Sequence, residues 1–100
     1  MSMYVEILSQ AIATTEVAPA AREALIKDVV ERRAQMLESR ALHEGSAETR
    51  IAREVAYDGA LIALCAELGI DIAPTRFANP REERTRLERE LSLAGVELER

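Results

Sequence analysis

Asp58 is the residue of this chain best placed to do chemistry, because it is a carboxylate inside an apolar, helix-length segment. It follows Glu54 by one helical turn, so the two acids would share a helix face. Burying a carboxylate without a partner is costly, and Arg32, Arg33 or Arg50 could reach Asp58. A paired, buried Asp58 would suit a binding groove or a pH-sensitive site. The simpler interpretation, which we favour, is that Asp58 and Glu54 mark the one solvated edge of the helix.

Cys65 and His43 are the only cysteine and the only histidine of the chain. A nucleophilic or redox-active thiol needs a nearby histidine or cation to lower its pKa. Cys65 instead stands among apolar neighbours, so we expect a small buried core residue. The acids nearest to His43, Glu44 and Glu48, do not form the Glu-x-x-His motif of metal-binding bundles. The sequence therefore predicts neither a metal site nor a cofactor.

Four arginines are spaced along the last predicted helix, which invites a nucleic-acid interpretation. They alternate with glutamates and point in different directions at 100° per residue, so they form no basic stripe; they are Arg81, Arg84, Arg86 and Arg89. We expect a solvated helix face. The chain also lacks a glycine-rich phosphate loop, a Ser/His/Asp set and zinc-type Cys/His spacing. The sequence predicts a protein that is not an enzyme.

Composition narrows the possible partners. The chain has 100 residues, 13 basic and 18 acidic side chains and a net charge of −5. One domain is expected at this length. An acidic surface disfavours nucleic acid and anionic membranes, which need basic residues. The single cysteine, the short apolar runs and an N-terminal stretch without basic residues predict a cytoplasmic protein rather than a secreted or membrane-spanning one.

The elements that must position these residues are all helices. Apolar spacing and end signals predict helices at about 2–16, 19–43, 46–68 and 80–94. Gly45 followed by Ser46, a good N-cap, predicts a tight antiparallel hairpin of the second and third helices. Asn79 and Pro80 should open the fourth helix with a capping box. Apolar residues in the connection before it should cover one end of the bundle; they are Ile70, Ile72 and Phe77. The predicted fold is an all-α four-helix bundle built on that long hairpin.

The third helix is apolar on nearly every face from Val55 to Leu68, so it must be surrounded by other elements. Gly59 in its middle suggests close approach of another helix. Three neighbouring helices of limited apolar width would leave part of the third helix uncovered. We therefore expect a possible interaction surface for a protein partner or a second copy of the chain, formed by Tyr57, Asp58, Leu61 and Leu64. A self-complementary surface would give a homodimer.

Two segments of the second half of the chain, 54–70 (EVAYDGALIALCAELGI) and 79–88 (NPREERTRLE), resemble a pattern of small uncharacterised helical proteins from high-GC Gram-positive bacteria. The resemblance implies a helical fold and a bacterial source. It brings no activity, cofactor or functional residue.

The leading hypothesis is a non-enzymatic module for protein–protein interaction or regulation. One alternative is a DNA-binding regulator that uses the third and fourth helices as a divergent helix-turn-helix. Its ten-residue connection is longer than the usual turn and its charge has the wrong sign. The other alternative is an enzyme of unknown reaction that uses Asp58, Tyr57 or Cys65 in a bundle cavity.

Overall fold

The computed structural model of the chain describes residues 3–14, 22–42 and 46–98. These residues form four α-helices and one short 3-10 helix, in the order α1 (Met3–Thr14), α2 (Arg22–Leu42), α3 (Ala47–Glu67), η1 (Pro74–Ala78) and α4 (Pro80–Leu93). The described residues contain no strand, so the predicted all-α fold is confirmed. The predicted ends of the first two helices near residues 2, 16, 19 and 43 lie outside the described residues.

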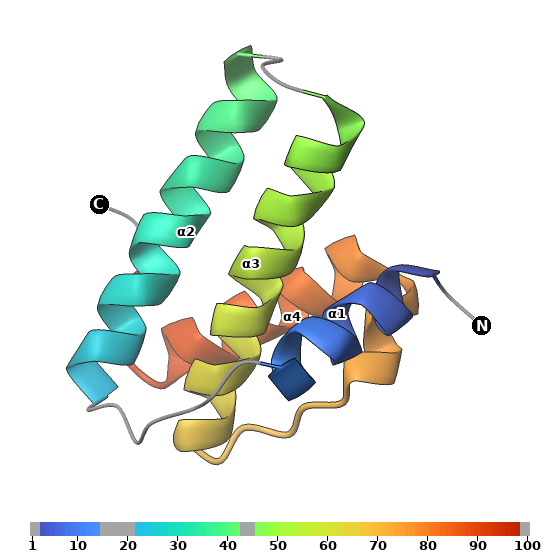
Figure 1. Cartoon of the computed structure of the whole chain (residues 1–100). Coiled ribbons are helices and arrows are strands. Elements are labelled where there is room, and N and C mark those ends of the chain that lie inside the picture. The colour runs from blue at the N-terminus through green and yellow to red at the C-terminus, as the bar shows by residue number, and fades with distance from the viewer. Residues whose placement is uncertain (1–2, 15–21, 43–45, 99–100) are drawn as a thin grey trace.

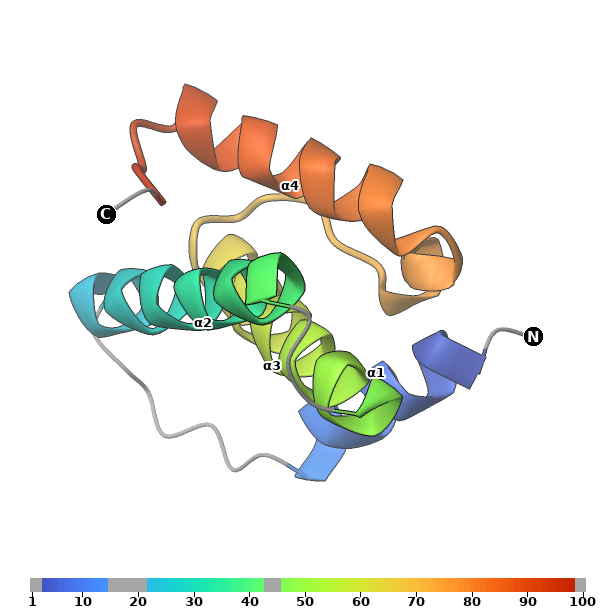
Figure 2. The same ribbon diagram turned by 90° about the horizontal axis from the view of Figure 1, so that it is seen from above.

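The hairpin of α2 and α3 is the long axis of the molecule (Figure 1). α1 and α4 cross the C-terminal half of α3 on opposite sides, so α3 lies between them with α2 alongside (Figure 2). η1 packs against both α1 and α4. The third helix is therefore surrounded by its own chain over its apolar half. The N-terminal half of α3 and the C-terminal half of α2 extend beyond the two crossing helices as the free end of the hairpin.

The ends of α3 follow the sequence signals. Ser46 is the N-cap, and its Oγ accepts a hydrogen bond from the backbone N–H of Thr49 at 3.2 Å. Past the other end, Gly69 has a φ of +74°, the left-handed conformation that glycine adopts without strain. The predicted helix of 46–68 differs from the observed one by a single residue at each end.

Asn79 does not cap α4 in the predicted way, although α4 begins at Pro80 as expected. The Asn79 side chain makes no capping hydrogen bond. The physical reason is η1, which the sequence analysis missed and which runs directly into α4. The Asn79 N–H already donates to the Arg76 carbonyl at 3.3 Å, so the backbone donor that a capping box would satisfy is occupied.

The connection between α3 and α4 covers one end of the core, as predicted. Phe77 is fully buried, and Ile70 and Ile72 are partly buried against the same cluster.

The expectation that another helix approaches closely at Gly59 was wrong. A Cβ added there would have no heavy atom within 4 Å, so no helix approaches closely at this glycine. In the part of the chain that the structure describes, no helix is long and apolar enough to cross a membrane.

Leu61 tests whether α3 is the centre of the fold. Its side chain is fully buried, so Leu61→Ala should lower the free energy of unfolding by about 2–5 kcal/mol. Leu93→Ala is the matched control, because Leu93 is 78% exposed and its loss should cost less than about 0.5 kcal/mol. Urea unfolding followed by circular dichroism measures both. Equal effects of the two substitutions would contradict the central position of α3.

Candidate functional site

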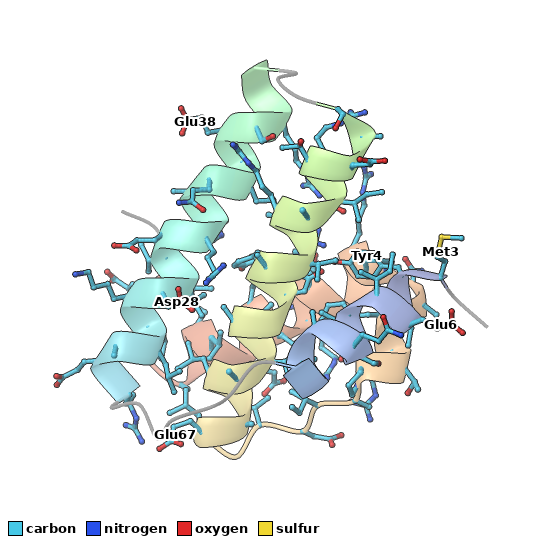
Figure 3. The ribbon with its side chains drawn as sticks, in the orientation of Figure 1. Met3, Tyr4, Glu6, Asp28, Glu38 and Glu67 are labelled. Atoms are coloured by element: carbon cyan, nitrogen blue, oxygen red, sulfur yellow. The ribbon has the colours of Figure 1, made fainter. Side chains whose placement is uncertain are left out.

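Asp58 lies at the centre of a buried polar contact between three helices. Its side chain is 0% exposed. Arg84 of α4 donates from Nε to Oδ1 and from Nη2 to Oδ2, each at 2.7 Å. The Tyr4 hydroxyl of α1 also donates to Oδ2. In Figure 3 the Tyr4 side chain turns toward α3, whereas Met3 and Glu6 project away from the bundle. A bidentate guanidinium is the strongest partner that a protein offers a carboxylate.

This contact corrects two sequence-based expectations. The solvated edge expected at Asp58 and Glu54 was wrong for Asp58, which is buried and paired. Its partner is Arg84 rather than Arg32, Arg33 or Arg50. The fourth helix does not present all its arginines to solvent either, because Arg84 is only 5% exposed. The reason is the crossing of α4 over α3, which no local pattern specifies.

A second tyrosine–carboxylate contact joins α2, α3 and α4. The hydroxyl of buried Tyr57 donates to Oε2 of Glu88 at 2.5 Å. Arg33 donates from Nε to the same oxygen at 3.3 Å. The two tyrosines of the chain therefore hold α4 through different carboxylates. Because Arg33 pairs with Glu88, Arg33 is not the partner of Asp58.

The residues expected to form an interaction surface are all interior. Each has a relative exposure of 0%; they are Tyr57, Asp58, Leu61 and Leu64. These four residues form part of the core and of the polar contacts just described. They therefore do not form an exposed interaction surface on the single chain. The physical reason is that α1, α2 and α4 cover α3 over this length.

Burial governs the proton affinities of these groups. It raises the pKa of both tyrosine hydroxyls well above the usual range, and the hydrogen bonds to Asp58 and Glu88 raise it further. Burial also raises the pKa of the Cys65 thiol to about 11. Burial alone would lower the pKa of Arg84, but Asp58 outweighs it and raises that pKa. The buried thiol confirms the expectation of a core cysteine, and its protonated form is a poor nucleophile.

An open cleft lies beside this polar core, at the free end of the hairpin. Its volume is about 520 Å³. Residues of α2, α3 and the first turn of α4 line it; they are Met36, Ser39, Arg40, Ala47, Arg50, Ile51, Glu54 and Arg81. Glu54 precedes Asp58 by one turn of α3, and Arg81 precedes Arg84 by three residues of α4. The buried Asp58–Arg84 contact thus fixes the two helix segments that face the cleft.

The charges of the cleft are only partly balanced. Arg40 donates from Nη2 to Oε1 of Glu54 at 2.6 Å, which ties α2 to α3. Within the described residues neither Arg50 nor Arg81 has an ion-pair partner. Ser39 is 2% exposed, and its Oγ has no hydrogen-bond partner among the described residues. A buried hydroxyl without a partner is uncommon and calls for an explanation.

Sequence reasoning did not find this cleft. It considered Arg50 only as a partner for Asp58 and Arg81 only as part of a solvated face. His43 and Glu44, which the sequence analysis considered for metal binding, lie outside the described residues. Ser39 carried no signal, because a serine inside a helix is ordinary. These side chains come together only because the first turn of α4 lies beside the α2–α3 hairpin in the folded chain.

The described residues contain no group of three or more His, Cys, Asp or Glu side chains that could hold a metal ion. No protein-family model, no curated protein and no solved structure matches the chain. The resemblance to helical proteins of high-GC bacteria therefore stays a prediction.

An alkaline titration tests the buried tyrosines. The folded protein holds the phenolic protons more tightly than the unfolded chain, whose tyrosines ionise near pH 10. This contribution to stability is complete below pH 10 and is lost as the pH rises further. Tyrosinate absorbance should therefore appear together with the loss of helical circular dichroism. In denaturant the tyrosinate absorbance should appear near pH 10. In the Tyr4→Phe variant the absorbance change comes from Tyr57 alone. Ionisation near pH 10 with the helices intact would contradict the contacts.

Proposed function

We propose that this protein is a non-enzymatic interaction module that binds a protein partner in the cleft at the free end of the α2–α3 hairpin. The observation that carries the proposal is a cleft in which two arginines lack an ion-pair partner, and one buried hydroxyl lacks a hydrogen-bond partner, among the described residues, beside an exposed apolar side chain. Ile51, at its rim, is 42% exposed. Aromatic and arginine side chains dominate binding energy at protein interfaces, and an apolar neighbour adds burial.

The buried groups support this proposal over the enzyme alternative. Asp58 has both oxygens engaged by Arg84 and Tyr4, and it is shielded from solvent. The raised pKa values of Cys65 and Tyr57 keep both groups protonated near neutral pH. General bases and nucleophiles need proton affinities tuned toward the working pH.

The placement of α4 weighs against the helix-turn-helix alternative. A recognition helix presents one exposed face to the DNA groove. In α4, Arg84 is buried against Asp58, and Arg86 donates to Glu83 at 2.7 Å from both Nε and Nη2. Exposed cations on this helix, Arg81 and Arg89, are eight residues apart and alternate with acids. Together with a net charge of −5, this arrangement favours a protein partner over nucleic acid.

We further propose that the protein works in a bacterial cytoplasm. The support is a single cysteine that is buried as a free thiol, as is common in reducing compartments.

A capture experiment tests the proposed function. Immobilised wild-type protein, Ile51→Asp and Leu93→Asp are each incubated with an extract of the cells in which the protein naturally occurs. The captured protein is then purified, and its binding to each variant is measured again. Wild type and Leu93→Asp should retain the same partner, whereas Ile51→Asp should lose it, because a charge at the rim opposes apolar burial. Light scattering on each variant shows whether the partner is a second copy. An identical set of bound proteins for all three baits would overturn the cleft as the binding site.

A further inference from the structure

We infer that the cleft recognises a single carboxylate side chain that is flanked by an apolar residue on the partner protein. The inference rests on the proposed function and names the chemistry of its ligand. The carboxylate would lie between Arg50 of α3 and Arg81 of α4 and would accept a hydrogen bond from Ser39 of α2. Met36 and Ile51 would contact the apolar neighbour.

The unbalanced cations point to an anion. Arg40 is already neutralised by Glu54, but Arg50 and Arg81 have no ion-pair partner in the described residues, and both are exposed. Guanidinium groups bind carboxylates through two parallel hydrogen bonds. The first residue of α3, Ala47, also lines the cleft. The N-terminus of this 21-residue helix adds positive potential there.

Ser39 supplies the independent observation. Its Oγ is buried in the cleft wall without a hydrogen-bond partner among the described residues. Leaving a buried hydroxyl unpaired costs about 1–3 kcal/mol. Alanine at this position would avoid that cost and favour the helix. Rotation of the Ser39 side chain about χ1 would turn the hydroxyl toward an acceptor bound in the cleft, so the cost in the free protein would be recovered on binding.

The size of the cleft and the charge of the whole chain favour one carboxylate over an acidic run. Within the cleft the Arg40–Glu54 pair is neutral, and the two remaining arginines attract any small anion, so phosphate is included among the probes below. The chain as a whole carries −5, which opposes a polyanionic partner at long range. A cleft of about 520 Å³ also exceeds the volume of a carboxylate alone and leaves room for an apolar side chain beside it.

The test is a titration of isotope-labelled protein followed by NMR. The probes are a capped peptide, acetyl-LEAL-amide, its glutamine counterpart acetyl-LQAL-amide, and inorganic phosphate. The glutamate peptide should shift the arginine Nε–H signals of Arg50 and Arg81 in a saturable way. The glutamine peptide should bind at least about fivefold more weakly, because hydrogen bonds to a charged acceptor are stronger.

Matched variants separate the cleft from general charge effects. Arg50→Gln and Arg81→Gln should each weaken the glutamate peptide about tenfold, which is the loss of one charge-assisted contact. Arg89→Gln removes the same charge from an exposed position outside the cleft and should change the affinity less than about twofold. Ser39→Ala should raise the unfolding midpoint in urea and still weaken the peptide, a combination that a purely structural serine does not give.

Three results would overturn the inference: equal affinity of the two peptides, equal effects of Arg50→Gln and Arg89→Gln, or the same shifts produced by phosphate at lower concentration than by the glutamate peptide. Its failure is distinguishable from failure of the proposed function. A partner that is lost by Ile51→Asp but bound normally by Arg50→Gln and Arg81→Gln would keep the interaction module and remove the carboxylate.

Discussion

The fold depends on one constraint, the burial of a carboxylate inside an otherwise apolar helix. Asp58 has no contact with solvent, and its charge must be compensated within the protein. Arg84 and Tyr4 compensate it from α4 and α1, two helices that lie on opposite sides of α3. Hydrophobic burial alone would tolerate sliding or rotation of these helices, whereas a bidentate contact fixes their register. Asp58 therefore specifies how the apolar surfaces meet, in addition to any stability that the contact contributes.

The same constraint positions the surface proposed for binding. Because Arg84 is held by Asp58, the first turn of α4 faces the hairpin and Arg81 reaches the cleft. On α3 the polar series Arg50, Glu54 and Asp58 runs from the cleft into the core. Charges are fully compensated at the buried end, where water is excluded, and only partly at the exposed end, where a ligand could complete them. The molecule thus combines a rigid polar interior with an incompletely paired rim.

Sequence reasoning recovered the features that local interactions determine. Ser46 and Gly69 bound α3, and the apolar periodicity identifies the helices, because caps and periodicity depend on residues within one or two turns. The pairing of Asp58 could not be predicted, since its partner is 26 residues away and becomes a neighbour only when α4 crosses α3. Ser39 and Arg81 belong to one site for the same reason. The interior position of Tyr57, Leu61 and Leu64 likewise depends on how completely three helices cover a fourth.

A double-mutant cycle on Asp58 and Arg84 tests this account most directly. The free energy of unfolding is measured for wild type, Asp58→Asn, Arg84→Gln and the double variant, beside the same cycle on the exposed Asp71–Arg76 pair. We expect each buried substitution to cost about 3–5 kcal/mol, with a coupling energy above about 2 kcal/mol, because either change leaves a buried group uncompensated. The exposed pair should couple by less than about 1 kcal/mol. Equal coupling in the two cycles would contradict the claim that Asp58 fixes the arrangement of the helices.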